Sequence, residues 1–272
     1  MKRRNDRVTE NSGKGMLMFK FLSGSYIIMR ALAKVKTETA QIEKENPYLE
    51  KSELQPSPCK LPDYERKIKP LLDHILSLAG LLILSPLFLF LSIAIFLDDP
   101  GPILFTQKRV GKDKKFFYLH KFRSMKMSTP HDIPTHQLEN PEQYITRIGK
   151  FLRKSSLDEL PQIWDIFRGR MSIIGPRPAL WNQEDLIEER DRYQANSVLP
   201  GLTGWAQING RDELEIPDKA KLDGEYVKQL RQGGMNALFF DVKCLWGTVR
   251  SVVEGDGVVE GGTGELSRRN RI

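Results

Sequence analysis

The densest run of side chains suited to phosphate chemistry lies between residues 147 and 177. Its charged members are Arg147, Arg153, Asp158, Glu159, Arg168, Arg170 and Arg177. Arginine forks bind phosphate through two parallel hydrogen bonds. Adjacent carboxylates can divide two tasks, one holding Mg²⁺ and the other attacking as a nucleophile. A solvated charged helix face would have the same composition, so the context of the pair has to decide.

The context of Asp158 and Glu159 favours a phosphate site. The pair lies in SSLDELP (155–161), and MSIIGPRP (171–178) follows it. Two prolines make the second segment a rigid turn, which presents Arg177 with little entropy left to lose on binding. The chain has no metal-binding histidine pair, no serine nucleophile elbow and no CxxC, and its four histidines are scattered.

Several predicted elements must position these residues. Two β-rich runs, 103–110 and 115–122, flank residues 111–114 and predict a hairpin. A helical period runs from 144 to 167 with Pro161 breaking it or starting a turn, and two further helices are expected at 184–193 and 219–230. The proline-containing stretch 127–141 is expected to be a loop. An apolar stripe within 238–253 is typical of a core helix; with Lys243 and Trp246 beside it, a membrane-surface role is the alternative.

An uncharged segment of 23 residues, Ile75 to Leu97, separates two basic blocks. A straight helix of that length would be roughly 35 Å long, enough for a hydrocarbon core of about 30 Å. Residues 1–70 carry a net charge of +6 and residues 98–126 one of +5. Basic flanks tend to remain in the cytoplasm, and Ser85-Pro86 interrupts the segment at its midpoint. A kinked spanning helix and a re-entrant helix both remain open at this point.

The ends of the chain are less informative. Residues 16–29 are apolar, broken by Lys20, and resemble a signal peptide; an interfacial amphipathic anchor is favoured. Residues 34–66 read as a linker, and 255–272 as a disordered tail. The two cysteines, Cys59 and Cys244, exclude a disulfide framework. Residues 127–272 carry a net charge of −3, which argues against nucleic-acid binding.

Six segments occur in the order found in one known family. The sequence resembles the bacterial sugar transferases, monotopic polyprenol-phosphate phosphoglycosyl transferases that initiate capsule, exopolysaccharide, O-antigen or glycoprotein glycans. The matching segments are LLILSP (81–86), DDPGPILFTQKRVG (98–111), HKFRSM (120–125), TRIGKFLRKSSLDELPQ (146–162), RGRMSIIGPRP (168–178) and LPGLTGWAQINGR (199–211). The resemblance covers about residues 65–250.

The resemblance implies a mostly helical α/β fold with four parts. Residues 1–64 would be an N-terminal extension or linker, and residues 65–98 a re-entrant membrane helix broken at Ser85 and Pro86. Residues 99–253 would form a small catalytic domain with a β-hairpin and amphipathic interfacial helices, and residues 254–272 a flexible tail. The expected location is the bacterial inner membrane, with the catalytic domain facing the cytoplasm.

The resemblance also implies the reaction and its residues. Asp158 would attack the β-phosphate of a UDP-sugar and release UMP, and polyprenyl phosphate would take the phosphosugar from the enzyme. Glu159 would hold Mg²⁺, and Arg153 and Arg177 would hold phosphate groups. Lys121, Arg123 and Arg211 are further substrate-binding candidates. The expected partners are both substrates and the lipid bilayer, with no nucleic acid; whether a homodimer forms stays open.

Three positions depart from the family pattern. Pro70 follows Lys69 where the family often has arginine, Asp165 replaces a usual asparagine, and Arg170 replaces a usual acid. Pro70 puts the helix start in question, and Arg170 the ion pairing near the site. A membrane-anchored scaffold that kept the fold and lost the reaction is the competing hypothesis, and the intact Asp158-Glu159 pair argues against it. The donor sugar is open among UDP-glucose, UDP-galactose and UDP-N-acetylated sugars.

Overall fold

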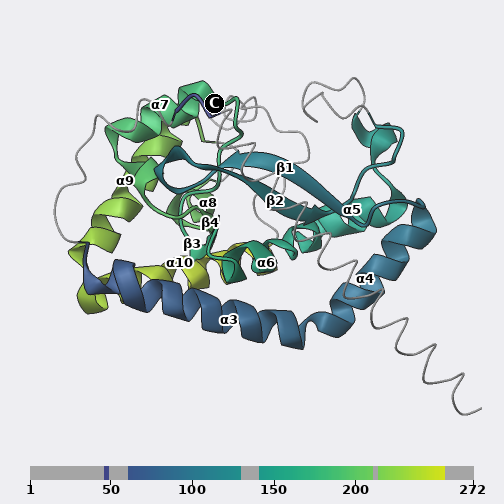
Figure 1. Cartoon of the computed structure of the whole chain (residues 1–272), viewed down its shortest axis with the longest axis horizontal. Helices are drawn as coiled ribbons and strands as arrows, with labels where there is room; N and C mark the ends of the chain where they lie inside the picture. The colour runs from purple at the N-terminus through teal and green to yellow at the C-terminus, as the bar shows by residue number, and fades with distance from the viewer. Residues whose placement is uncertain (1–45, 49–60, 130–140, 211–213, 255–272) are drawn as a thin grey trace, which may run out of the picture. The chain divides into compact units, whose positions relative to one another are not determined.

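The computed structural model describes residues 46–48, 61–129, 141–210 and 214–254. The predictions for residues 16–29, for most of the linker and for the tail after residue 254 lie outside these ranges. The first long feature is a bent helix pair (Figure 1). A π-helical turn, η1 (Tyr64–Ile68), runs into α3 (Lys69–Ile83), and α4 (Ser85–Asp98) follows after a bend of 60°.

The bend has a local cause at Pro86. Proline has no N–H to donate to the carbonyl four residues earlier, which is that of Leu82. The hydroxyl of Ser85 donates to this carbonyl at 2.8 Å and takes the place of the missing donor. The predicted helix break at Ser85-Pro86 is therefore confirmed, and its freed carbonyl has a partner.

The predicted hairpin is also confirmed. Strands β1 (Leu104–Val110) and β2 (Phe116–Phe122) pair antiparallel, joined through the 3₁₀ turn η2 (Lys112–Lys114). Phe105 lies opposite Lys121, and Arg109 opposite Phe117. Side chains alternate between faces with period two. The side chains of Lys121 and Arg109 therefore share one face of the hairpin, the face on which Phe117 and Leu119 pack into the core.

Helices occur in each predicted helical region, with breaks inside the first, and the short helical turns at 195–197 and 205–208 were not predicted. The helices and helical turns after the hairpin are η4 (Pro141–Tyr144), α5 (Arg147–Lys154), η5 (Leu157–Glu159), α6 (Gln162–Phe167), α7 (Glu184–Arg192), η6 (Ala195–Ser197), α8 (Trp205–Ile208), α9 (Ile216–Gln232) and α10 (Gly234–Glu254). The Thr146 side chain caps α5 by accepting from the Gly149 N–H at 2.9 Å. Pro161 directly precedes α6.

A second, smaller sheet was not predicted. Strand β3 (Ser172–Ile174) pairs in parallel with β4 (Gly201–Thr203). Three-residue strands give too short an alternation to stand out in a sequence. The turn that carries Arg177 leaves directly from the end of β3, so this pair fixes where the turn begins.

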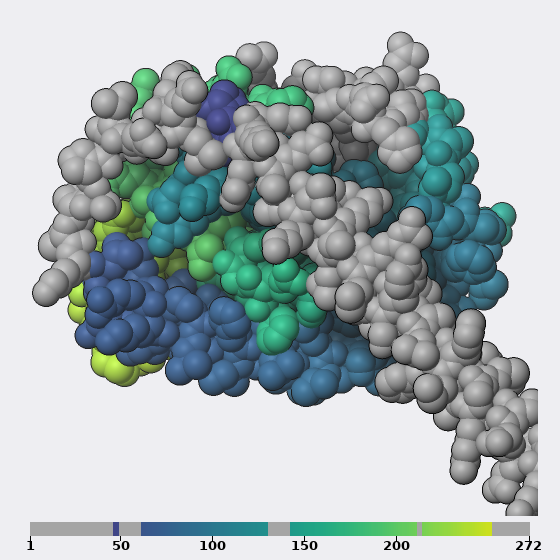
Figure 2. Space-filling view, viewed as in Figure 1, coloured from purple at the N-terminus to yellow at the C-terminus, as the bar shows by residue number. Residues whose placement is uncertain are grey.

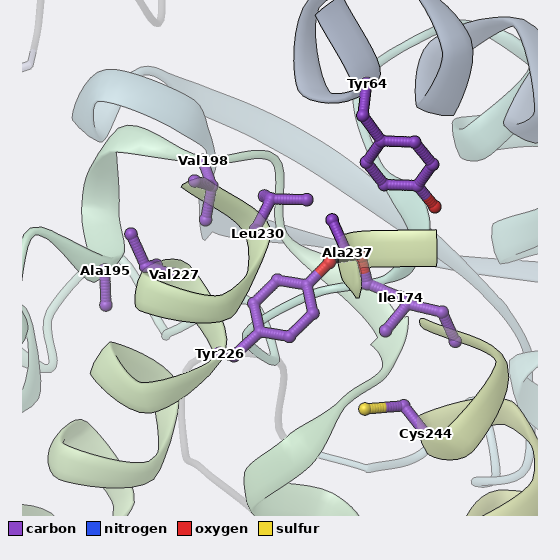
Figure 3. Close-up of a cluster of buried hydrophobic side chains, with 9 residues drawn as sticks. All are labelled: Tyr64, Ile174, Ala195, Val198, Tyr226, Val227, Leu230, Ala237 and Cys244. Atoms are coloured by element: carbon purple, nitrogen blue, oxygen red, sulfur yellow. Dashed lines mark hydrogen bonds between the residues drawn. The ribbon is translucent and has the colours of Figure 1, made fainter. Parts of the chain in front are cut away.

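The main core joins α9, α10, β3 and the start of the bent pair. Figure 3 shows its buried side chains, including Tyr64, Ile174, Tyr226 and Cys244. The hydroxyl of Tyr226 lies 3.0 Å from both the Ile174 carbonyl oxygen and an Asp241 carboxylate oxygen, which share its one proton. Tyr64 donates to Asp241 at 2.7 Å. Buried polar groups of this kind have to be hydrogen-bonded, and these are.

The apolar stripe of α10 is more exposed to solvent than a core helix would be. The apolar stripe within 238–253 was expected to be core, with a membrane-surface role as the alternative, and Leu238 does pack against the core. The outward side of the helix is different, because the following large apolar side chains are exposed: Met235, Phe239, Val242, Leu245, Trp246 and Val249. Since Asp241 and Cys244 occupy the inward face, the rest of the stripe has to point outward.

The bent pair also exposes apolar side chains. On α3 these include Leu71, Ile75, Leu82 and Ile83, and on α4 Leu89, Phe90, Ile93, Phe96 and Leu97. In Figure 2 the blue surface of α3 borders the lower edge of the molecule. Among the described helices no single one has the length and composition to span a membrane, whereas the bent pair Tyr64–Ile83 and Ser85–Asp98 taken together does.

Candidate active site

Glu159 lies where three separate segments meet. Lys121 of β2 donates to Glu159 Oε1 at 2.9 Å. Arg177, from the turn after β3, donates to Oε1 at 2.6 Å and to Oε2 at 3.3 Å. The carboxylate is only 13% exposed. Burial alone would raise its pKa, but the two cations and their hydrogen bonds hold the pKa of Glu159 well below its usual range. Glu159 is therefore ionised at neutral pH.

Asp158, its neighbour, has a different environment. No described residue donates a hydrogen bond to its carboxylate, in contrast to Glu159. Burial raises the pKa of Asp158; the charge of Lys121 opposes this shift and that of Glu159 adds to it. Two adjacent carboxylates are thus held in two states, one bound to cations and one open to react. Such divergence between paired acids is typical of catalytic sites.

The short 3₁₀ turn η5 creates this divergence. Ser156, just before it, has a φ of 55°, a left-handed conformation that redirects the chain out of α5. The turn that follows carries Asp158 and Glu159 in consecutive positions with different surroundings. Lys121 reaches this turn because β2 contacts η5. In Figure 1 α5 and α6 lie beneath the hairpin, on either side of this turn in the chain.

The other predicted binding residues separate into three groups. Arg153 is close enough to lower the pKa of Asp158, and its Nε donates to Ser124 at 2.9 Å. Arg123 instead grips the end of α4, where it hydrogen-bonds the Asp99 carbonyl and lies 3.3 Å from the Asp99 carboxylate. Arg211 lies outside the described residues. The structure thus brings together Lys121, Arg153, Asp158, Glu159 and Arg177.

Asp165 and Arg170, two of the positions that depart from the family pattern, lie close together in the chain next to the site. Asp165, fully buried in α6, accepts from the backbone N–H of His120 at 2.9 Å and contacts its ring Nδ1 at 2.8 Å. Burial lowers the pKa of Arg170, and the charge of Asp165 opposes that shift. The side-chain partner of Asp165 is thus His120, and this contact fixes β2 next to Lys121.

A magnesium ion was expected from the resemblance, and its donors can be tested. Among the residues that the structure describes, no group of three or more His, Cys, Asp and Glu side chains could hold a metal. Mg²⁺ is commonly bound by one or two carboxylates, with waters and substrate phosphates as its remaining ligands. Glu159 Oε2 accepts one long hydrogen bond, at 3.3 Å. A carboxylate oxygen with that capacity, beside Asp158, fits Mg²⁺ bound together with a diphosphate.

Two residues near the site were missed in the sequence. Arg109 donates to the carbonyl of Pro178, in the turn that carries Arg177, and His120 pairs with Asp165. Arg109 could have been found from the sequence, because side chains alternate between the two faces of a hairpin and this alternation places Arg109 on the same face as Lys121. His120 gave no such signal, because its partner lies on an element whose packing the sequence does not show.

The comparisons with known proteins address this same region. The family described as bacterial sugar transferase matches residues 64–255. The chain belongs to the bacterial sugar transferase family. The matched range contains the bent helix pair, both sheets and every described residue of the candidate site, so family membership covers the whole described domain.

Individual sugar transferases agree with this membership. The chain is 43% identical over 184 residues to UDP-glucose:undecaprenyl-phosphate glucose-1-phosphate transferase of Xanthomonas campestris pv. campestris, covering 65% of this chain and 37% of that protein. It is 38% identical over 191 residues to the protein of the same name in Escherichia coli (strain K12), covering 68% and 40%. Exopolysaccharide production protein PSS of Rhizobium leguminosarum bv. phaseoli is 36% identical, covering 68% and 94%.

These coverages limit what transfers from the relatives. The chain spans about two fifths of the length of both glucose-1-phosphate transferases, and nearly all of the PSS protein. Relatives named for other sugars also match. They include an N-acetylgalactosamine phosphotransferase of Aeromonas hydrophila at 34% identity and a galactose phosphotransferase of Salmonella typhimurium at 32%. Family membership therefore does not select the donor.

Proposed function

We propose that the protein transfers a sugar 1-phosphate from a UDP-sugar to undecaprenyl phosphate and releases UMP. The observation that carries this proposal is the contrast at residues 158 and 159. Glu159 is held by Lys121 and Arg177, while the Asp158 carboxylate beside it has no hydrogen bond from the described residues. A free carboxylate beside cations is the arrangement that nucleophilic attack on a diphosphate requires.

The proposed first step forms an enzyme-bound phosphosugar. A carboxylate oxygen of Asp158 attacks the phosphorus that bears the sugar. The bond from that phosphorus to the bridging oxygen breaks, and UMP leaves with that oxygen and its electron pair. A carboxylate approaching a diphosphate is repelled unless cations neutralise both. Arg153 and Arg177 supply positive charge here, and a bound Mg²⁺ would add charge neutralisation at the leaving phosphate.

The second step returns the enzyme to its starting state. A phosphate oxygen of undecaprenyl phosphate attacks the same phosphorus, and the bond to the Asp158 oxygen breaks. The product is a lipid diphosphate sugar, and the carboxylate is free again. Because both substrates are anions, using one site in turn avoids binding them together. Lys121, at 2.9 Å from Glu159, remains in place to hold the phosphoryl oxygens during each transfer.

The bent helix pair supports a re-entrant membrane segment. At its start Lys69 pairs with Asp241, and Asp73 accepts from the backbone N–H of Ile173 at 3.0 Å. At its end the Asp98 carboxylate accepts from the N–H of Ile148 at 2.9 Å. Both ends are thus bound to one globular body. A helix that crossed a bilayer would hold its ends about 30 Å apart on opposite sides.

The proposed location follows from the same feature. The exposed apolar faces of α3, α4 and α10 would contact lipid, and the basic flanks would lie at the cytoplasmic surface of the inner membrane. The catalytic body would face the cytoplasm, where UDP-sugars are made. A transferase placed there would carry out the first membrane step of a surface polysaccharide or glycoconjugate.

The test is UMP release from a panel of UDP-sugars. The detergent-purified full chain is given Mg²⁺, undecaprenyl phosphate and one donor at a time: UDP-glucose, UDP-galactose or a UDP-N-acetylated sugar. Lipid-dependent UMP release with at least one donor is expected, with the sugar recovered on the lipid. Failure with every donor, in a preparation that unfolds cooperatively on heating, would favour a scaffold that has lost the reaction.

A further inference from the structure

Arg109 connects the hairpin to the turn that carries Arg177. It lies near the end of β1, and its NH1 group donates to the Pro178 carbonyl at 3.0 Å. Its NH2 group donates to the Gln107 side chain, two residues earlier on the same face, at 2.6 Å. Its Nε–H is buried and has no partner among the described residues.

The backbone makes a second link at the same place. The N–H of Val110 donates to the Ala179 carbonyl at 3.0 Å, and Arg109 forms an antiparallel bridge with Leu180. The chain after Arg177 is therefore tied to β1. The chain before it is tied to the second sheet, because the Gly175 N–H donates to Thr203 at 2.8 Å. Arg177 therefore lies in a short segment that is hydrogen-bonded to a strand region at both of its ends.

The energetics of Arg109 are unusual for a structural arginine. Its hydrogen bonds go to a carbonyl and an amide, and no carboxylate pairs with it among the described residues. Burial and the neighbouring charge of Arg177 lower the pKa of Arg109 to about 10. The desolvation cost of Arg109 is therefore not offset by an ion pair with a described carboxylate; the charge of Arg177 adds repulsion, which the charge of Glu159 opposes in part. In exchange for this cost, the planar guanidinium of Arg109 makes directed hydrogen bonds that restrain the turn carrying Arg177.

We propose that Arg109 is a positioning residue. Its hydrogen bond to the Pro178 carbonyl fixes the turn so that the Arg177 guanidinium stays hydrogen-bonded to the Glu159 carboxylate. This inference rests on the proposed function, since it assigns Arg109 a part in that site. Arg109 acts through Arg177 and needs no contact with substrate. The single hairpin then controls both cations on Glu159: β2 carries Lys121 itself, and β1 holds the turn that presents Arg177.

A double-mutant cycle in the UMP-release assay separates positioning from plain stability. Arg109→Lys keeps the charge and loses the fork, so kcat/KM should fall about 100-fold, the scale of a 1 Å misplacement. In an Arg177→Lys background the same change should cost less than about threefold, because the group it positions is already gone. Arg192→Lys, at an exposed arginine of α7, is the matched control. Equal losses in both backgrounds would overturn the proposal.

Hydrogen–deuterium exchange supplies a readout that needs no activity. Arg109→Lys should speed exchange in peptides covering residues 175–180 and leave those of α9 unchanged, whereas Arg192→Lys should change neither. Gln107→Leu removes only one anchor of Arg109 and should give the same pattern more weakly. Unchanged exchange at 175–180 in Arg109→Lys would overturn the proposal. A wild-type chain without UMP release would instead remove the proposed function, with the exchange result still deciding the role of Arg109.

Discussion

The ammonium group of Lys69 lies 2.8 Å from the carboxylate of Asp241, 172 positions later in the sequence. This contact joins the start of the bent helix pair to the middle of α10. The sequence left the start of the helix in question because Pro70 follows Lys69. In the structure Lys69 turns inward to Asp241, and Pro70 occupies the first turn of α3, directly after the π-helical turn η1.

Removing the charge of Asp241 should destabilise the fold. Asp241→Asn leaves Lys69 buried without its ion-pair partner, which costs about 3–5 kcal/mol in the free energy of unfolding. The double variant Lys69→Met with Asp241→Asn removes both charges and should recover part of the loss. Urea unfolding followed by tryptophan fluorescence measures both. An Asp241→Asn chain as stable as the wild type would show that the pair contributes nothing.

The Cys244 thiol should be protected from alkylation in the folded state. Burial and the nearby charge of Asp241 raise its pKa to about 12, and only the thiolate reacts. In a Cys59→Ser chain, iodoacetamide labelling at pH 8 should be slow until urea unfolds the protein. Because the unfolded chain loses this proton at lower pH, the thiol should also lower stability as pH rises from about 8.5 towards 12. Fast stoichiometric labelling of the native protein would contradict the burial.

Replacing Asp158 should abolish turnover without unfolding the chain. Asp158→Asn is nearly isosteric, and an amide is a far poorer nucleophile than a carboxylate. Wild-type protein given a UDP-sugar and Mg²⁺ without lipid should release about one UMP per site and gain the mass of one phosphosugar. The variant should show neither. An active variant without any mass gain would point to direct attack by the lipid phosphate.

Replacing Glu159 and removing Mg²⁺ should each abolish most of the activity. Glu159→Gln removes the charge that we propose binds Mg²⁺, and it removes the anchor of Lys121 and Arg177. Activity should therefore fall by several orders of magnitude, the scale of lost metal-ion stabilisation. EDTA should abolish wild-type turnover, and added Mg²⁺ should restore it. Glu215→Gln, at the residue before α9, is the matched control and should stay within about twofold of wild type. Full activity in EDTA would remove Mg²⁺ from the mechanism.

Both ends of the bent pair should face the cytoplasm. In a Cys59→Ser background, single cysteines at Arg66 and Lys112 should both resist a membrane-impermeant reagent in intact cells and react after lysis. Labelling of only one from outside would indicate a spanning helix. Pro86→Ala restores the donor for the Leu82 carbonyl and should straighten the pair. That change is expected to expose one site, because a straight helix can span.

Local patterns predicted more of the fold than long-range contacts did. The hairpin followed from alternation, and the break at Ser85-Pro86 from proline chemistry, because both are properties of adjacent residues. The pairing of Asp165 with His120 and the parallel β3–β4 pair depend on segments far apart in the chain. The Asp158-Glu159 pair was found by its motif, but which acid is held and which is free depends on Lys121 and Arg177, and only packing determines that.

The close approach of the two backbone segments that follow β3 and β4, beside Arg177, also limits which substitutions the chain can accept. A Cβ atom at Gly175 would lie 2.5 Å from the Leu199 carbonyl oxygen, and one at Gly204 would lie 2.2 Å from that of Gly175. Both backbones therefore meet with no room for a methyl group. Mutational libraries should find these positions closed to every other residue. Variation of this chain near Arg177 is therefore confined to the side chains around the two glycines, because a side chain at either glycine would displace the backbone that leads to Arg177.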